Sequence, residues 1–528
     1  MNFKLYTLIF LLGIFCTSCE DFLSTEPTNF IAPEYSTIAE LETGLSGVYD
    51  VLGSQATYGD VIPYWLNVST DIEYTNTGQL NTTAYIYTPT DAQITNLWKT
   101  LYQGIYRANL VLAKVDNPEL DEDARNKIKG QALFLRGYYY FLLVKNYGGV
   151  PMLLTEKPDI GNVNVPRSSI EEVYAHILQD MKAAEGLVEE AENLSGGGRI
   201  SRSAVQGILA RVCLTMAGYP LGDKPKYAEA LEWAKKVQES NFHALNPDYK
   251  DIFIKYAKDE YDNKESIWEV EFYGLLSSGS QEYTYYIGAR GGIRSADEQI
   301  GYSGGSVLAT RWLYDLYETG DENSESPEES PDLRRDWNIA PFTYIGVPAV
   351  QTYNPDLWRR TMGKWRREYE TLTPKDRVVS AQNFPILRYS DVLLMIAEAE
   401  NEVNGPTGLA YDAINQVRRR AYGLLLPVPP NPEVDAELPS GMSKAEFFQA
   451  IIDERAREFC FEASRRPDYI RWGTFVGRMK EYRVWALEND AAQGHVLAPT
   501  NISERNYLLP IPTAEMALNK ALTQNPGY

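Results

Sequence analysis

The chain of 528 residues carries 50 lysines and arginines against 72 aspartates and glutamates, and 44% of its residues are hydrophobic. This length and composition predict a folded body with a substantial core, made of one large domain or several ordinary ones. The formal net charge of −22 disfavours nucleic acid as a ligand, and the chain contains no basic run that would offset it.

The N-terminus has the features of a lipoprotein signal peptide. Lys4 precedes an apolar run at residues 8–15, which is much shorter than the roughly 20 residues that span a bilayer. Two small residues then precede Cys19, and this arrangement resembles a bacterial lipobox. We therefore expect residues 1–18 to be cleaved and Cys19 to carry the lipid that tethers the mature chain, residues 19–528, to a membrane. An ordinary secretory signal that happens to contain cysteines is the alternative.

Helical periodicity dominates two parts of the chain. Apolar residues recur at three- and four-residue steps in five successive segments within residues 91–240. The pattern returns at residues 391–403, at residues 410–420 and from residue 443 to about residue 464. Paired amphipathic helices with short joins predict tetratricopeptide-like hairpins over about 91–240 and 386–465, although no regular repeat appears.

Two other parts, at about residues 60–90 and 265–385, have a different pattern. Residues 267–272 alternate in hydrophobicity like a strand, and a half-buried strand also explains the alternation of Tyr85 and Tyr87 with their neighbours. The remainder is rich in Gly, Ser and Tyr, and its aromatic content argues against disorder. We therefore expect a mainly α-helical protein with loop-rich insertions.

The two cysteines that follow Cys19 are Cys213 and Cys460, and both lie in apolar helical patterns. These surroundings favour buried free thiols, with a disulfide between the two residues as the alternative.

Motifs for catalysis and metal binding are weak. Residues 301–305 fit the G-x-S-x-G pattern of a serine hydrolase, but the segment before them is polar and His495 is the only later histidine. Three histidines and the absence of C-x-x-C from the mature chain predict no metal site. The acidic turn at residues 321–332 could bind calcium, but it lacks the EF-hand spacing. The abundant carboxylates leave a glycosidase pair open.

Six blocks of sequence, in this order along the mature chain, resemble the SusD/RagB family of outer-membrane nutrient-binding lipoproteins from Bacteroidetes. They are CEDFL, ALFLRGYYYFLLVKNYGGVPML, GRISRSAVQGILARVCLTMAG, ILRYSDVLLMIAEAENEVNG, ERAREFCFEASRRPDYIRWG and NYLLPIPTAEMALNKALTQNPGY. One departure is Ala463-Ser464, where the family more often has a glycine. The acidic pair Glu20-Asp21 is similar to the signals that send such lipoproteins to the cell surface.

The resemblance implies tetratricopeptide-like helical hairpins with an inserted loop-rich region that carries the ligand surface. It also implies a lid on a SusC-like TonB-dependent transporter of the outer membrane, without catalysis and without a cofactor. We therefore expect a cell-surface glycan-binding lipoprotein that delivers oligosaccharides to such a transporter. A peptide-binding member of the family, a secreted glycoside hydrolase and an adaptor that holds only proteins are the alternatives.

Aromatic residues in the irregular segments are the candidate glycan contacts, because tyrosine and tryptophan rings cover the apolar faces of sugars. The candidate rings are Trp65, Tyr74, Tyr283, Tyr285, Tyr286 and Tyr302, and the candidate partners for sugar hydroxyls are Asp71, Asn81, Gln281 and Arg290. Large aromatics are commonly half buried, so we expect only part of this set to contact the ligand. Aromatic residues in the helical segments, such as Trp233, are expected to pack.

Overall fold

The computed structural model describes residues 35–76, 81–157, 161, 163–276, 282–319 and 329–528. The signal peptide, the lipidation candidate Cys19 and the candidate contact Gln281 lie outside the described residues, as does most of the acidic turn at residues 321–332.

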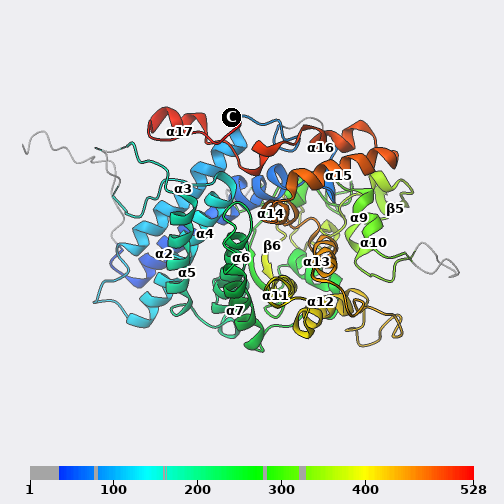
Figure 1. Ribbon diagram of the computed structural model, residues 1–528, viewed down its shortest axis with the longest axis horizontal. Helices are drawn as coiled ribbons and strands as arrows, with labels where there is room; N and C mark the ends of the chain where they lie inside the picture. Colours follow the sequence, from blue (N-terminus) through cyan, green and yellow to red (C-terminus); the bar gives the residue numbers. More distant parts are fainter. Residues whose placement is uncertain (1–34, 77–80, 158–160, 162, 277–281, 320–328) are drawn as a thin grey trace, which may run out of the picture.

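A stack of helices forms one side of the molecule. Neighbouring helices pack pairwise along the chain through α2, α3, α4, α5, α6 and α7, and α7 then packs against α11 although residues 240–388 separate them. Figure 1 shows this stack crossing the molecule from the blue and cyan helices to the yellow and orange ones. The helices of the stack are α2 (Ile38–Gly53), α3 (Ala92–Leu112), α4 (Glu122–Tyr147), α5 (Ile170–Glu185), α6 (Arg202–Ala217), α7 (Lys226–Glu239), α11 (Tyr389–Asn404), α12 (Gly408–Ala421) and α13 (Lys444–Phe459).

The stack confirms the predicted helical hairpins and adds α2, which lies outside the predicted ranges. Thr37 caps α2 through a capping box with Glu40, and its apolar positions Leu41, Leu45 and Val48 are fully buried. A buried apolar stripe of this kind is the main source of stability for a helix in a folded protein.

Helix α13 ends earlier than predicted. Its last residue is Phe459 rather than a residue near 464, because Phe461 and Ala463 adopt positive φ angles of 64° and 57°. A left-handed backbone conformation interrupts a helix and favours glycine. This explains the preference for glycine near Ala463 in the family that the sequence resembles. The chain then forms the short helix α14 (Arg465–Arg471), followed by α15 (Phe475–Glu488), α16 (Leu497–Asn501) and α17 (Thr513–Leu518).

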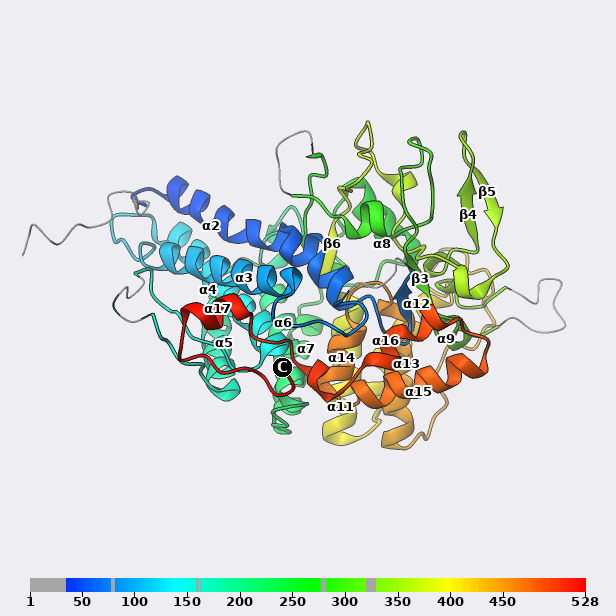
Figure 2. The same ribbon diagram turned by 90° about the horizontal axis from the view of Figure 1, so that it is seen from above.

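The segment between α7 and α11 forms a separate layer against the stack. Figure 2 shows α8 and the hairpin of β4 and β5 on the opposite side of the molecule from α5, α7 and α13. The described strands form three two-stranded antiparallel sheets, which pair β1 with β3, β2 with β6 and β4 with β5. The elements are β1 (Glu73–Thr75), α8 (Tyr249–Lys258), β2 (Ser266–Val270), β3 (Val307–Ala309), α9 (Arg311–Leu316), α10 (Arg335–Asn338), β4 (Phe342–Ile345), β5 (Val350–Tyr353) and β6 (Phe384–Arg388).

Two strand predictions need correction. The strand predicted at residues 267–272 exists as β2, but all five of its residues are buried rather than every second one. Trp268 on the apolar face packs edge to face on rings of α4, as expected. Glu269, on the face that was expected to meet solvent, is only 2% exposed, because its carboxylate accepts hydrogen bonds from Ser266 and Asn383. Neither Tyr85 nor Tyr87 lies in a strand: Tyr85 ends a turn with a φ of 57°, Tyr87 lies in the irregular segment after it, and both rings are buried.

A buried ionic network joins the loop-rich layer to the stack. Arg388 at the end of β6 pairs with Glu265 before β2 and with Glu458 of α13, in each case at 2.8 Å. Arg420 of α12 also contacts both carboxylates, and Arg334 reaches Glu458 at 2.9 Å. All of these side chains are at most 1% exposed. The network therefore fixes how the inserted layer sits on the helices.

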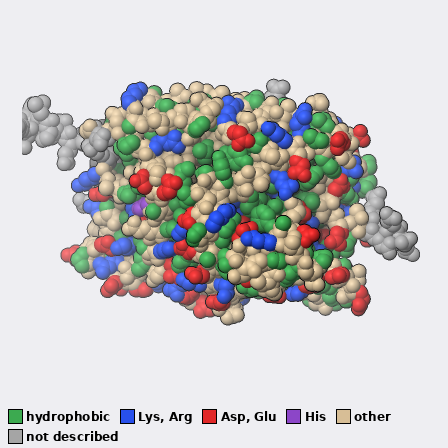
Figure 3. Space-filling model, in the orientation of Figure 1, with side chains coloured by type: hydrophobic (Ala, Val, Ile, Leu, Met, Phe, Trp, Pro, Cys, Tyr) green, Lys and Arg blue, Asp and Glu red, His purple; other side chains and the backbone are tan. Residues whose placement is uncertain are grey.

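Cys213 and Cys460 are both buried and free, so the predicted free thiols are confirmed and a disulfide between them is wrong. Among the described helices, none combines the length and the apolar composition that a membrane span requires. On the face that Figure 3 presents, acidic and basic side chains are interspersed, and hydrophobic side chains gather near the centre.

Candidate ligand-binding site

Two π-helical turns follow α2 and form one wall of the candidate site. They are η2 (Gln55–Gly59) and η3 (Val61–Leu66), and Asp60 lies between them. The chain passes close to residues 283–285 here: the carbonyl oxygen of Gly59 accepts hydrogen bonds from the backbone N–H of Tyr285 and from the Thr284 hydroxyl, both at 3.0 Å. A Cβ at Gly59 would lie 2.9 Å from the carbonyl oxygen of Tyr283, so this approach requires glycine.

The opposite wall is a third π-helical turn, η6 (Tyr286–Arg290), which begins directly after Tyr285. It directs Arg290 back toward η3. The guanidinium carbon of Arg290 lies 4.8 Å from the ring centre of Tyr64, 5.0 Å from that of Trp65 and 6.0 Å from that of Tyr285. Cation–π attraction therefore holds three rings from two distant segments around one cation.

Asp60 orients both Arg290 and Trp65. Its carboxylate accepts hydrogen bonds from Nε of Arg290 at 2.8 Å, from Nη2 of Arg290 at 3.1 Å and from the indole Nε1 of Trp65 at 2.7 Å. Burial raises the pKa of Asp60, while Arg290 and Trp65 act in the opposite direction by stabilising the carboxylate. Asp60 thus acts as a positioning residue beneath the cluster, because it is itself only 6% exposed.

The accessible part of this cluster consists of partly exposed side chains. Trp65 and Tyr285 are half-buried, the side chain of Arg290 is 31% exposed, and Gln55 is half-buried and donates to the Tyr283 hydroxyl at 2.7 Å. We call the set of Gln55, Trp65, Tyr285 and Arg290 the Arg290 surface. The Arg290 surface therefore presents two aromatic side chains, a guanidinium and an amide to solvent, and Asp60 orients two of these side chains from beneath.

Four predicted contacts lie inside the protein, and their assignment to the ligand surface is corrected. Asp71 is 1% exposed and accepts hydrogen bonds from Arg465 and from the Tyr469 hydroxyl, both at 2.7 Å. A buried carboxylate with these partners stabilises the fold. The other three are the buried rings of Tyr74, Tyr283 and Tyr286.

The buried rings each have an internal hydrogen-bond partner. The hydroxyl of Tyr74 donates to the carbonyl oxygen of Trp358, and that of Tyr286 donates to the carbonyl oxygen of Phe461 at 3.0 Å. Tyr283 is 4% exposed and supports Tyr285 through an edge-to-face contact at 5.5 Å. Of the neighbouring rings Tyr283, Tyr285 and Tyr286, only Tyr285 is partly exposed, and a simple alternation does not predict this because Tyr283 and Tyr285 are two positions apart.

Two further candidates are exposed or half-exposed but lie apart from the Arg290 surface. Asn81 is exposed and contacts Asp91 at 3.5 Å. Tyr302 is half-buried, and the guanidinium carbon of Arg377 lies 5.1 Å from its ring centre. No contact joins either residue to the Arg290 surface within the part of the chain that the structure describes.

Sequence reasoning identified Trp65, Tyr285 and Arg290 but missed Gln55 and Asp60. Asp60 and Trp65 meet because they are five residues apart on a π-helical turn, a spacing that neither an α-helix nor a strand brings together. Such turns are rare and often occur at functional sites. An acidic residue five positions before a tryptophan in an irregular segment is therefore the sequence signal for this pair.

The G-x-S-x-G motif does not form a nucleophile elbow. Ser303 is 2% exposed, its hydroxyl donates to the carbonyl oxygen of Gly291, and its backbone pairs with Ser295 in an isolated bridge. A nucleophilic serine must be exposed at a sharp strand-to-helix turn. Over the described ranges, no three His, Cys, Asp or Glu residues gather in a way that could hold a metal ion.

Known proteins resemble this chain over most of its length. The SusD-like protein P25 from Formosa agariphila is 27% identical over 559 residues, which cover 97% of each chain. The starch-binding protein SusD from Bacteroides thetaiotaomicron is 23% identical, over 84% of this chain and 80% of that protein.

A crystal structure of a SusD homolog from Bacteroides thetaiotaomicron superposes with a TM-score of 0.83 at 27% identity, covering 94% of this chain and 98% of that one. The family model described as "SusD family" matches residues 264–528, and a second model, described as "Starch-binding associating with outer membrane", matches residues 21–214. Together with the helical stack and its inserted layer, these matches show that the chain belongs to the SusD family.

Proposed function

We propose that this protein is a cell-surface lipoprotein of the outer membrane that binds oligosaccharides at the Arg290 surface and passes them, uncleaved, to a SusC-like TonB-dependent transporter. The single observation that carries the proposal is the grouping of Trp65, Tyr285 and Arg290 as partly exposed side chains around one cation. These residues come from segments more than 200 positions apart, and hydrogen bonds to the carboxylate of Asp60 orient Trp65 and Arg290.

The chemistry of this surface suits a sugar. An aromatic ring covers the flat C–H face of a pyranose, and a neighbouring guanidinium and amide donate hydrogen bonds to its hydroxyls. Because internal contacts already orient Arg290 and Trp65, little conformational freedom is lost when a ligand binds. Related proteins support this ligand class: one relative is named starch-binding, and a structure with a TM-score of 0.70 is named a laminarin-binding SusD-like protein.

Titration calorimetry against a panel of oligosaccharides tests the proposal. If a sugar covers about 80 Å² of the Trp65 ring, Trp65→Ala removes about 2 kcal/mol at about 25 cal/mol per Å², which is roughly a 30-fold loss of affinity. Trp233→Ala is the matched control, because Trp233 is also half-buried but lies on α7 in contact with Lys236. It should bind sugars like the unaltered protein.

The same titrations separate the alternatives. Binding of oligosaccharides without shorter products supports a capture protein, whereas released products would reveal a hydrolase. Binding of peptides but of no sugar would make this a peptide-binding member of the family. Equal affinities of the Trp65→Ala and Trp233→Ala variants would remove the Arg290 surface from the site.

The anchor and the transporter are tested in cells. We expect Cys19→Ala to leave the membrane fraction when the gene for the transporter is deleted, because no acyl chain then holds the protein. If this variant still sediments with outer membranes, the lipid tether at Cys19 is wrong. In the unaltered strain, co-purification of a TonB-dependent barrel with the protein supports the proposed partner.

A further inference from the structure

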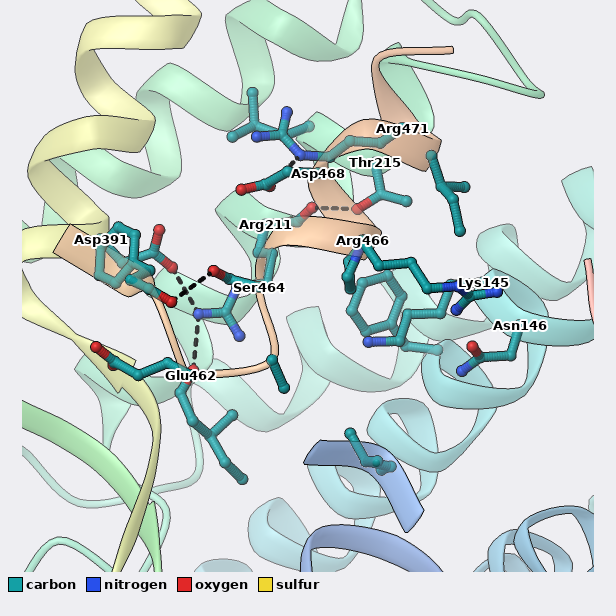
Figure 4. A pocket seen from close by; sticks show the side chains of 18 of the residues that line it. Lys145, Asn146, Arg211, Thr215, Asp391, Glu462, Ser464, Arg466, Asp468 and Arg471 are labelled. Carbon is teal, nitrogen blue, oxygen red and sulfur yellow. Dashed lines mark hydrogen bonds and ion pairs between the residues drawn. The ribbon is translucent and has the colours of Figure 1, made fainter. Parts of the chain in front are cut away.

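A cavity of about 120 Å³ lies between the helical stack and α14, separate from the Arg290 surface. Figure 4 shows side chains from α4, α6 and α14 converging on it. Its apolar wall includes Phe141 and Leu214, and its polar wall includes Lys145 and Arg466. Tyr58 and Ile62 also line it, so the π-helical segment that carries Trp65 on one side closes this cavity on the other.

The carboxylates that line the cavity are already neutralised. Each of them forms two or more ion pairs at 2.9 Å or less with arginine or lysine side chains. The three carboxylates are Asp391, which pairs with Arg211 and Arg455, Asp468, which pairs with Arg455 and Arg471, and Glu462, which pairs with Lys364 and Arg388. None is left to balance a further cation.

Two cations at the cavity have no carboxylate partner within 4.0 Å among the described residues, namely Lys145 and Arg466. Arg466 is 2% exposed, its Nε has no hydrogen-bond partner, and its Nη2 donates only to the carbonyl oxygen of Asn506 at 3.3 Å. The Nζ of Lys145 lies 5.4 Å from the ring centre of Phe141. An unpaired cation is costly to bury, and buried charges in proteins are ordinarily paired, so the unpartnered Nε of Arg466 calls for a compensating group.

We propose that this cavity binds a small oxyanion, a sulfate or phosphate group, between Lys145 and Arg466. Guanidinium and ammonium groups donate several charge-assisted hydrogen bonds to such oxygens. Lys145 and Tyr219 remain partly exposed at the cavity, which gives the anion a route from solvent. The same two cations would bind a free ion or the sulfate or phosphate group of a sugar ester, and the apolar wall would contact the organic part of the ester.

The charges around Lys145 make the binding depend on pH. Burial first, and then the charges of Arg211 of α6 and Arg466 of α14, together lower the pKa of Lys145 to about 7, while Asp468 of α14 acts in the opposite direction. Sulfate keeps its charge over this range, so a change in its affinity reports on the protein. With a pKa of about 7, the protonated fraction of Lys145 falls about tenfold between about pH 6 and about pH 8.

Calorimetric titration of the full chain with sodium sulfate, at constant ionic strength set by chloride, tests the site. We expect binding at about pH 6 that weakens up to about tenfold at about pH 8. Lys145→Met should lose at least about tenfold in affinity at about pH 6, whereas Lys236→Met on α7 should bind like the unaltered protein. Lys145→Arg keeps the charge without a titration in this range, so it should bind sulfate equally at both pH values.

Several outcomes decide the proposal. Equal sulfate affinity of Lys145→Met and the unaltered protein overturns it, as does the absence of sulfate binding at about pH 6. If Lys145→Met does not fold, a persisting pH dependence in Lys145→Arg overturns it. A parallel titration with glucose 6-sulfate distinguishes a sugar ester from the free ion as the preferred source. Sugar binding at the Arg290 surface should be unchanged in these variants, so the two proposals fail independently.

Discussion

Replacing Glu458 by glutamine should destabilise the joint between the helical stack and the loop-rich layer. Its carboxylate, which is fully buried, accepts hydrogen bonds from Arg420 at 2.6 Å, from Arg388 at 2.8 Å and from Arg334 at 2.9 Å. Burial alone would raise the pKa of Glu458, but these guanidinium groups lower it from 4.5 to about 2. The difference corresponds to about 3 kcal/mol of stability at neutral pH.

The sign of this contribution follows from the lowered pKa. It is fully present above the unfolded value near 4.5 and is lost as the pH falls toward about 2. Glutamine resembles the protonated side chain, so Glu458→Gln should cost about 3 kcal/mol at neutral pH, in line with the 3–5 kcal/mol for breaking a buried ion pair. The difference in the free energy of unfolding between the unaltered protein and Glu458→Gln should become smaller below about pH 4.5.

Urea unfolding measures this cost from the shift in midpoint at a shared slope. Glu437→Gln is the control, because Glu437 pairs with Arg419 at 2.6 Å but its side chain is 43% exposed, and such pairs contribute less than about 1 kcal/mol. If Glu458→Gln shifts the midpoint no more than this control does, the reasoning about the buried network is wrong.

Three further predictions concern buried residues. Burial raises the pKa of Cys213 to about 12 and that of Cys460 to about 11, so a thiol reagent should label neither in the native protein and both in denaturant; rapid native labelling would contradict their burial. Asp71→Asn should lower the free energy of unfolding by about 3–5 kcal/mol, since Asp71 forms a buried ion pair with Arg465. The oligosaccharide affinity of the folded variant should be unchanged; a loss of affinity without a loss of stability would show that Asp71 contacts the ligand. Gly104→Ala would place a Cβ 2.6 Å from a tyrosine ring carbon of α4 and should cost about 1–3 kcal/mol; an unchanged thermal midpoint would refute this.

Some features of this protein can be predicted from a short stretch of sequence, whereas others depend on contacts between distant residues. A lipidation signal is a short contiguous sequence motif, so the expectation for Cys19 requires no knowledge of the tertiary structure. The helices of the stack are also local, because an apolar stripe at three- and four-residue steps appears in the sequence whether or not its partner is known. The end of α13 and the full burial of β2 are less local, because Ala463 adopts a left-handed backbone in the folded chain and Glu269 is buried against Asn383 from a distant segment.

The candidate site depended on both levels. Composition drew attention to Trp65, Tyr285 and Arg290, but it weighted the neighbouring ring of Tyr286 equally. Tertiary packing separated them: Tyr286 turns inward to the carbonyl oxygen of Phe461, whereas Tyr285 faces Arg290. The sequence of a loop does not state which of two adjacent rings is buried, because that depends on the partner surface.

By itself, the sequence determined the helical class and the aromatic character of the irregular segments, since each follows from residues close together along the chain. Only the tertiary structure decided which charges are neutralised. Asp71 lies beside Arg465, while Lys145 and Arg466 line one cavity and neither pairs with a carboxylate of the described residues. Ionic and cation–π interactions act over a few ångströms between residues that are hundreds of positions apart, so they are decided only when the chain has folded.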